Sequence, residues 1–242
     1  MTQLLVSAKN VEEALLLAAL GVDIIDLKDP NIGALGALDL TLTQEIVTVV
    51  SGKAVISATV GEHHVDLAVL LNAIGARTAL GIDIIKIAVN AAILNDDFIK
   101  AMQVLAEQGV QLVALIFADA GIDESALKMI KQAGFYGAML DTQNKALSLT
   151  QIAPNNSLQS FVLGCKKNHL KSGLAGSLKP QHLESLLHLQ ATYLGFRGSV
   201  CDNGMRNTAI NSNKVIELKN VLLKHNKISN KAHESIYLAL HT

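Results

Sequence analysis

Apolar runs of five to seven residues alternate with amphipathic stretches along the chain. The runs are rich in β-branched residues and continuously apolar, which is typical of strands that are covered on both faces in a parallel sheet. Between them, stretches such as 11–20 and 123–134 carry apolar residues at helical spacing. The pattern predicts eight strands, at residues 4–8, 22–28, 54–60, 82–88, 111–117, 137–141, 172–176 and 193–197.

Eight strand–helix units in 242 residues predict an α/β protein with the length of one (β/α)8 barrel, or TIM barrel. We therefore expect a single barrel domain over residues 1–242. A doubly wound open sheet is the alternative, but no Gly-x-Gly-x-x-Gly motif follows the first expected strand. Residues 21–28 resemble residues 81–88, which hints at duplication of one unit.

Charged residues interrupt two of these apolar strands. "VDIIDLK" carries Asp26 and Lys28, and "IDIIKIA" carries Lys86 at the position equivalent to Asp26. Side chains alternate between the two faces of a strand. The faces expected to point into the barrel are therefore Val22, Ile24, Asp26 and Lys28 in one strand, and Ile82, Ile84, Lys86 and Ala88 in the other.

This alternation places Lys28 at the carboxyl end of the barrel, with Asp26 and Lys86 one layer below. Asp141, the last residue of the sixth expected strand, reaches the same end. Barrel enzymes hold their active sites there. The alternative is a purely structural Asp26–Lys86 ion pair with Lys28 outside in a loop, although a buried pair seldom adds net stability.

Two lysines in one desolvated site favour Schiff-base chemistry. Burial and like charge both lower the pKa of an amine, which leaves a neutral nucleophile or base near pH 7. The carboxylates of Asp26 and Asp141 are candidates for proton transfer or for holding the remaining ammonium. The segment "LDTQNK" adds a further amine, Lys145.

Two Gly-Ser pairs predict a phosphate site. Gly176-Ser177 follows the seventh expected strand and Gly198-Ser199 follows the eighth, each at the expected start of a helix. Barrels commonly bind phosphate with these two loops, through backbone N–H groups that a small residue leaves accessible. Ordinary helix N-capping by serine is the alternative.

The composition indicates which binding partners and which cellular compartment to expect. The net charge is −1 and the sequence pI about 6.7, which argues against a nucleic-acid surface, and "KKNHLK" (166–171) suits a solvated helix end. Cys165 and Cys201, without a leader or a membrane span, indicate a reduced, cytoplasmic protein. Apolar residues make up 50% of the chain and charged residues 17%, so we expect a homo-oligomer.

No cofactor and no metal are expected. The adjacent Glu62, His63 and His64 are a weak metal candidate, since neighbouring side chains rarely reach one ion and no partner cluster is evident. Cys201 is expected to be a packed thiol because no base lies beside it in the sequence. Gly33 and Gly36 suit a loop that closes over the mouth, or plain turns.

Seven ordered blocks carry a family resemblance over nearly the full length. They are "LLVS", "DIIDLKDP" with "GALGA", "SATVG", "DIIKIA", "MLDTQNK", "GLAGSLK" and "RGSVCDNGMR". With these blocks the chain resembles the (5-formylfuran-3-yl)methyl phosphate synthases, also called 4-(hydroxymethyl)-2-furancarboxaldehyde-phosphate synthases, of methanofuran biosynthesis.

The resemblance implies a lysine-dependent (β/α)8 barrel, similar to class I aldolases, that acts as a carbon–oxygen lyase. It implies that two glyceraldehyde 3-phosphate molecules combine into one phosphorylated furan aldehyde, with release of phosphate and two waters. By position, Lys28 resembles the Schiff-base lysine and Lys86 the general base, while Asp141 and Lys145 resemble the supporting acid–base pair and Asp26 their partner in the lumen. A simple class I aldolase and a non-catalytic phospho-ligand sensor are the alternatives.

Overall fold

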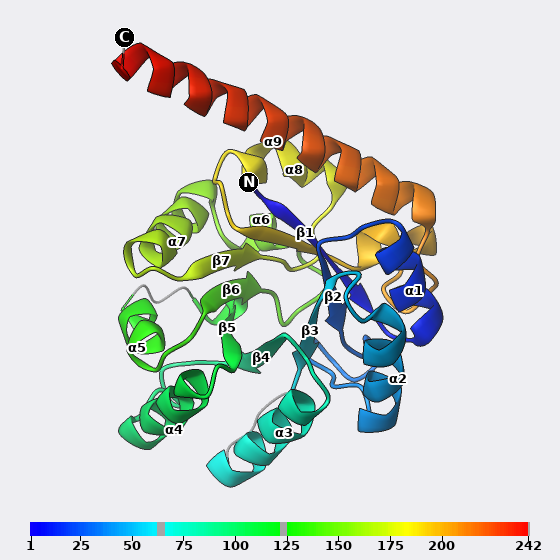
Figure 1. Ribbon diagram of the computed structural model, residues 1–242, viewed down its shortest axis with the longest axis vertical. Helices are drawn as coiled ribbons and strands as arrows, with labels where there is room; N and C mark the ends of the chain where they lie inside the picture. Colours follow the sequence, from blue (N-terminus) through cyan, green and yellow to red (C-terminus); the bar gives the residue numbers. More distant parts are fainter. Residues whose placement is uncertain (62–65, 122–124, 242) are drawn as a thin grey trace.

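The computed structural model describes residues 1–61, 66–121 and 125–241. Eight parallel strands form a closed barrel in sequence order, and β8 pairs with β1 (Figure 1). The (β/α)8 prediction is confirmed, and every predicted strand end lies within two residues of an observed one. The strands are β1 Gln3–Ala8, β2 Ile24–Leu27, β3 Val55–Thr59, β4 Ile84–Ala88, β5 Gln111–Phe117, β6 Gly137–Asp141, β7 Lys171–Leu174 and β8 Tyr193–Phe196.

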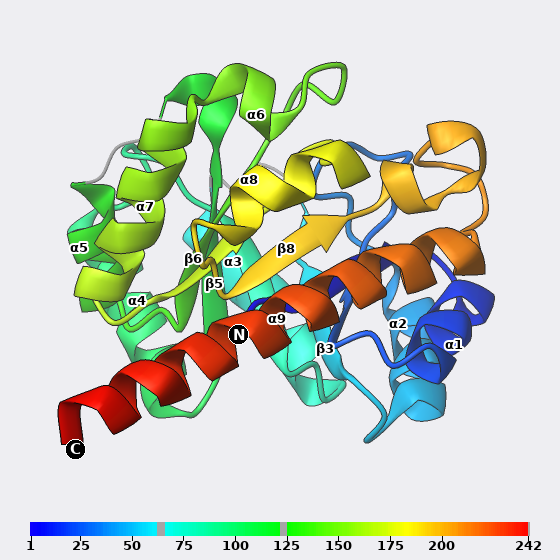
Figure 2. The ribbon, with the colours of Figure 1, turned by 90° about the horizontal axis from the view of Figure 1, so that it is seen from above.

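Helices surround this barrel, as Figures 1 and 2 show from two sides. The last helix passes along β1, and its C-terminal end extends beyond the barrel (Figures 1 and 2). None of the described helices combines the length and the apolar character needed to cross a membrane. The helices are α1 Val11–Ala19, α2 Leu40–Val50, α3 Leu67–Ala79, α4 Asp96–Glu107, α5 Ala126–Gln132, α6 Leu149–Ile152, α7 Asn155–Lys167, α8 Leu183–Leu187 and α9 Ser212–His241.

Two apolar cores lie on opposite sides of the strands. The larger core packs the helices against the outside of the barrel, and the smaller core fills the lumen. The expected lumen face is confirmed for Ile24 and Ile84, which belong to the smaller core. The expectation is wrong for Val22 and Ile82. Both precede the first strand residue, where the alternation does not yet apply, and both pack in the outer core.

The similar segments 21–28 and 81–88 also fold alike. Asp23 precedes β2, and its carboxylate accepts a hydrogen bond from the Leu4 backbone N–H at 2.8 Å. Asp83 precedes β4, and its carboxylate accepts from the Ile56 backbone N–H at 2.7 Å. In each unit the aspartate therefore anchors the strand to the preceding one in the barrel.

Candidate active site

A cavity of about 440 Å³ opens at the carboxyl ends of the strands. Residues at the ends of β2 and β6 and in the loops after β6, β7 and β8 contribute to its wall. Lys86 is not part of the lining. The other residues predicted to be catalytic or to bind phosphate all line this cavity: Asp26, Lys28, Asp141, Lys145, Gly176, Ser177, Gly198 and Ser199.

Asp26 forms a buried ion pair under the cavity. Its carboxylate is fully buried and lies 2.5 Å from the Lys86 ammonium, which is 2% exposed. Ser57 and Ser7 donate hydrogen bonds to the two carboxylate oxygens at 2.8 and 3.1 Å. Burial alone would raise the pKa of Asp26, but the charges of Lys86 and Lys28 outweigh it and lower that pKa below its ordinary value.

Lys28 lies one layer higher, directly after β2. Its backbone N–H donates to the Ala8 carbonyl at 3.1 Å and so continues the barrel ladder by one residue. The side chain is 8% exposed and its ammonium lies 3.9 Å from Asp141. The alternative that Lys28 points outward from a loop is therefore wrong. Burial lowers the Lys28 pKa to about 8, although Asp141 and Asp26 act to raise it.

A second acid–base pair covers the same side of the cavity. Lys145 lies four residues after Asp141, and its ammonium contacts that carboxylate at 2.6 Å and also donates to the Thr142 carbonyl. The Thr142 backbone N–H donates to the Asp141 carboxylate at 2.7 Å. Burial would raise the pKa of Asp141, but Lys145 and Lys28 lower it below its usual range. Asp141 is therefore an ionised carboxylate between two lysines.

The loop after β7 holds Lys145 in place. Gly176 has a φ of +107°, and a Cβ there would lie 2.6 Å from the Thr142 side chain, so this close approach requires glycine. The Ser177 hydroxyl donates to the Lys145 carbonyl at 2.9 Å. The expected helix start at Ser177 is wrong, because the chain takes a positive φ there and enters a 3₁₀ turn only at Pro180.

The loop after β8 carries the second Gly-Ser pair. Gly198 begins a 3₁₀ turn, Gly198–Val200, rather than the expected helix, and Ser199 gives no side-chain cap. The Ser199 hydroxyl is buried and has no hydrogen-bond partner among the described residues. It therefore has unused hydrogen-bonding capacity at the wall of the cavity.

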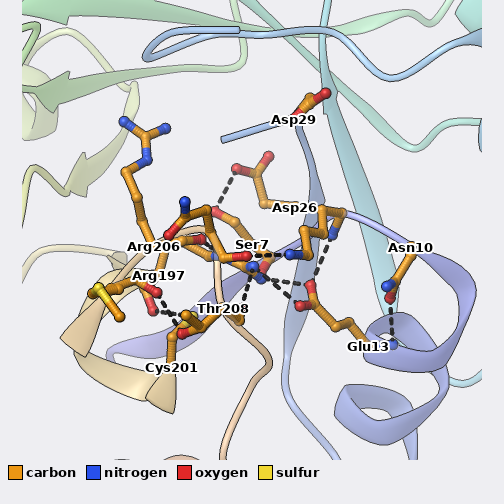
Figure 3. A network of polar contacts seen from close by, with 12 residues as sticks. Ser7, Asn10, Glu13, Asp26, Asp29, Arg197, Cys201, Arg206 and Thr208 are labelled. Carbon is orange, nitrogen blue, oxygen red and sulfur yellow. Dashed lines mark hydrogen bonds and ion pairs between the residues drawn. The ribbon is translucent and has the colours of Figure 1, made fainter. Parts of the chain in front are cut away.

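Two arginines of this loop, which were not predicted from the sequence, also line the cavity. Arg197 forms a buried bidentate pair with Glu13 at 2.5 and 3.0 Å (Figure 3). Arg206 donates to the Gly33 carbonyl at 2.7 Å, so it bridges to the loop that follows Lys28. Both arginines stand in the block "RGSVCDNGMR", and an arginine beside a predicted phosphate loop was the available signal.

Neither the predicted metal candidates nor Cys201 is among the described residues that line the cavity. Glu62, His63 and His64 fall outside the described residues. Among the residues that are described, no three His, Cys, Asp or Glu side chains cluster in a way that could hold a metal ion. Cys201 is packed as expected, since its buried thiol donates to the Arg197 carbonyl at 3.2 Å and burial raises its pKa.

The fold and the site define a (β/α)8-barrel enzyme whose cavity is built from lysines and aspartates. A family model described as 4-HFC-P synthase matches residues 4–219. The chain belongs to this family. A protein of Methylorubrum extorquens is 38% identical over 216 residues, which cover 89% of each chain. A protein of Methanocaldococcus jannaschii named (5-formylfuran-3-yl)methyl phosphate synthase is 35% identical, with coverage of 89% of this chain and 97% of its own.

Solved structures share the fold at lower identity. Phosphoribosyl anthranilate isomerase from Thermus thermophilus aligns with a TM-score of 0.67 at 12% identity and covers 92% of this chain and 99% of its own. 3-Hexulose-6-phosphate synthase from Salmonella typhimurium aligns with a TM-score of 0.62 at 15% identity and covers 93% and 100%. At such identities the comparison supports only the barrel fold.

Proposed function

We propose that this protein condenses two glyceraldehyde 3-phosphate molecules into 4-(hydroxymethyl)-2-furancarboxaldehyde phosphate, with release of one phosphate and two waters. Membership of the 4-HFC-P synthase family supports this reaction. The observation that carries it is Lys28, a cavity-lining lysine whose pKa is lowered to about 8. At pH 7 roughly a tenth of such an amine is neutral, compared with less than one part in a thousand for an ordinary lysine.

Lys28 starts the reaction as the nucleophile. Its neutral amine adds to the aldehyde of one triose phosphate, and loss of water leaves an iminium. The positive iminium lies beside Asp141, 3.9 Å from the lysine nitrogen, so the carboxylate stabilises the charge that develops there. The iminium withdraws electrons from the neighbouring carbon and thereby acidifies its α-proton.

The Asp26–Lys86 pair receives that α-proton. Asp26 lines the cavity, whereas Lys86 lies behind it in direct contact with the carboxylate. Lys86 is the general base in this scheme: its neutral amine accepts the α-proton by way of Asp26 and becomes the ammonium that pairs with that carboxylate. Deprotonation converts the iminium into an enamine, whose nucleophilic carbon attacks the aldehyde of the second triose phosphate.

The Asp141–Lys145 pair handles the later proton transfers. Lys145 is a cavity-lining ammonium with a partner at 2.6 Å, so it is placed to protonate the oxygens that leave. Loss of phosphate, ring closure and two dehydrations give the furan ring, and one water hydrolyses the imine, which releases the furan aldehyde and regenerates Lys28. Aromaticity makes the final product stable and draws the preceding, reversible steps forward.

Ultraviolet absorbance with glyceraldehyde 3-phosphate tests the proposal. A furan aldehyde absorbs in the near ultraviolet, whereas the aldol that a simple class I aldolase would form does not. Borohydride added during turnover should attach a triose to Lys28, which peptide mapping locates. Absorbance without an adduct would contradict the lysine mechanism, an adduct without absorbance would favour the aldolase, and neither signal would favour the sensor.

The reaction is assigned to a biosynthetic pathway and to the cytosol. The product belongs to the synthesis of a methanofuran-type one-carbon carrier, and the substrate is a small phosphorylated triose. Cys165 and Cys201 are both free thiols, which suits the cytosol. A homo-oligomer, one domain over residues 1–242, and the absence of nucleic-acid and membrane partners stay predictions.

A further inference from the structure

Two serines flank the Asp26 carboxylate at one level of the barrel. In the strand register, Asp26 lies opposite Ser7 of β1 on one side and opposite Ser57 of β3 on the other. Both serines are buried, and both hydroxyls donate to the carboxylate, Ser7 at 3.1 Å and Ser57 at 2.8 Å. The two serines therefore support Asp26 from neighbouring strands in much the same way.

The two serines differ in their access to the cavity. Ser7 lines it, whereas Ser57 and Lys86 do not. Ser57 and Lys86 both contact the Oδ1 oxygen of Asp26, at 2.8 and 2.5 Å. The hydroxyl of Ser7 instead contacts the other oxygen, Oδ2. A ligand in the cavity therefore meets Oδ2 and the Ser7 hydroxyl together.

The Ser7 hydroxyl has unused hydrogen-bonding capacity. A serine hydroxyl donates one hydrogen bond and can accept two. Its proton goes to Asp26 (Figure 3), and no donor within residues 1–61, 66–121 and 125–241 contacts the oxygen. A ligand hydroxyl that donates to Ser7 therefore uses a free lone pair and leaves the bond to Asp26 in place.

The backbone of Ser7 is also held in a fixed position. The Arg197 guanidinium donates to the Ser7 carbonyl at 3.0 Å (Figure 3). This guanidinium is itself buried, because it pairs with Glu13 and donates to the carbonyls of Arg206 and Thr208. Since the strand and the arginine both fix Ser7, a ligand meets a hydroxyl that needs no further ordering.

A triose phosphate brings a hydroxyl to this place. The α-carbon of glyceraldehyde 3-phosphate carries the aldehyde carbon, a proton, a hydroxyl and the phosphate-bearing carbon. Lys28 takes the aldehyde carbon and the Asp26–Lys86 pair receives the proton, so the hydroxyl still lacks a partner. Because proton and hydroxyl are on one carbon, a proton directed at Asp26 puts the hydroxyl beside that carboxylate, where Ser7 lies.

We propose that Ser7 is a specificity-determining residue that binds the α-hydroxyl of the first triose phosphate. This inference rests on the proposed function and adds the group that makes the enzyme select 2-hydroxyaldehydes. With the aldehyde carbon on Lys28 and the hydroxyl on Ser7, rotation about the bond between these two carbons is fixed. The α-proton then faces Asp26, which is the orientation that its removal requires.

Two unreactive ligands test the assignment without Schiff-base chemistry. sn-Glycerol 3-phosphate and 3-hydroxypropyl phosphate differ only in the hydroxyl on the middle carbon. In isothermal titration calorimetry the wild type should bind the first roughly three- to tenfold more tightly, as expected for one hydrogen bond. The preference should disappear in Ser7→Ala and persist in Ser57→Ala. Ser57→Ala is the matched control, because it removes the other serine bond to Asp26.

Ser7→Cys is a second variant of nearly the same size as the wild type. Its thiol hydrogen-bonds weakly, so it should lose most of the preference as well. Equal affinities in the wild type, or a preference that survives in these variants, would overturn the proposal. A preference lost equally in Ser57→Ala would also overturn it, because Ser7 would then act only through Asp26. Circular dichroism shows which variants are folded.

Borohydride trapping at Lys28 separates this inference from the proposed function. It is measured with glyceraldehyde 3-phosphate and with 3-phosphooxypropanal, which lacks only the α-hydroxyl. The ratio of the two trapping efficiencies should fall roughly three- to tenfold in Ser7→Ala and stay constant in Ser57→Ala. Adducts with an unchanged ratio in Ser7→Ala would overturn the role of Ser7 and keep the lysine mechanism.

The opposite result is equally informative. A calorimetric preference that depends on Ser7, without any Lys28 adduct in the wild type, would refute the lysine mechanism and keep Ser7 as a hydroxyl ligand. Neither binding nor an adduct in the wild type would overturn both.

Discussion

The units around β2 and β4 have almost the same construction and different chemistry. Each begins with a glycine of positive φ, at Gly21 and Gly81. Each then carries an aspartate that anchors the strand to its predecessor, and an isoleucine that fills the lumen. The next lumen-facing position holds Asp26 in β2 and Lys86 in β4, and these two side chains form the buried pair.

The difference in lumen-facing residues lies in the upper two layers. One layer above the pair, β2 is followed by Lys28, whereas β4 ends with the small Ala88. The shared residues of each unit build the barrel. The two lumen-facing positions that differ supply the Asp26 carboxylate, the Lys86 amine beside it and the Lys28 amine above them. Opposite charges at equivalent positions allow the two units to hold each other's functional groups in place.

Lys28→Ala has the largest expected effect, because it gives β2 the residue that β4 carries at this position. Furan formation should fall by more than about 10⁴-fold, as it does when a covalent nucleophile is removed. The borohydride adduct should disappear as well, and far-ultraviolet circular dichroism should be unchanged. An adduct that moves to Lys86 in this variant would reverse the roles of the two lysines.

Lys86→Ala breaks the pair that joins the two units. It leaves the Asp26 carboxylate buried without its ammonium, which should cost about 3–5 kcal/mol of unfolding free energy in urea titrations. Furan formation should fall about 10²–10⁴-fold, while trapping at Lys28 persists. The charge swap Asp26→Lys with Lys86→Asp should regain part of the stability without the activity. Full activity in the swapped protein would contradict a defined role for either position.

The pH dependence of borohydride trapping distinguishes Lys28 from an ordinary lysine. Adduct formation should rise with pH to a midpoint near 8, where the amine becomes neutral. Asp141→Asn removes the charge that raises this pKa, so its midpoint should lie lower. A trapping rate that still climbs steeply above pH 9.5 would show that Lys28 titrates as an exposed amine.

The Lys28 amine should also make the free energy of unfolding depend on pH. The folded pKa of Lys28, about 8, lies below the ordinary value of 10.5, so the unfolded chain binds more protons between these values. The unfolding free energy should therefore rise with pH across this window, by on the order of 3 kcal/mol. Lys28→Met should flatten that rise in urea titrations at pH 8 and 10.5.

The smallest effects should come from the shared scaffold. Asp23→Asn and Asp83→Asn each weaken one charge-assisted bond to a backbone N–H, and each should cost about 1–2 kcal/mol. The two losses should be alike and additive, with the kcat of furan formation unchanged. Unequal losses, or a change in kcat, would show that the two units are less equivalent than their geometry indicates.

The local pattern of apolar and charged residues was sufficient to predict the barrel and the lumen layer in which most site residues lie. The two-residue period of a strand places Asp26 under Lys28, and this required no knowledge of the rest of the chain. The same rule fails for Val22, which lies before the strand begins. Continuous apolar runs placed all eight strands for the same local reason.

The loops were predicted less well, because their conformation depends on distant contacts. Ser177 looks like a helix cap in sequence, but its hydroxyl donates to Lys145, which lies 32 residues away. Arg206 was missed because its acceptor, Gly33, is 173 residues away and no periodic pattern links them. The catalytic roles of the lysines and aspartates, and the phosphate roles of the Gly-Ser pairs, stay predictions.

The Glu13–Arg197 pair has a consequence for how the protein is made. Its partners are separated by 184 residues, and at about 5–20 residues per second translation takes roughly 10–40 s to add the arginine after the glutamate. Throughout that interval the nascent chain contains the Glu13 carboxylate without Arg197, its partner in the folded protein. Barrel closure by β8 and completion of the cavity wall therefore both come late in synthesis, and a product that stops before β8 lacks both.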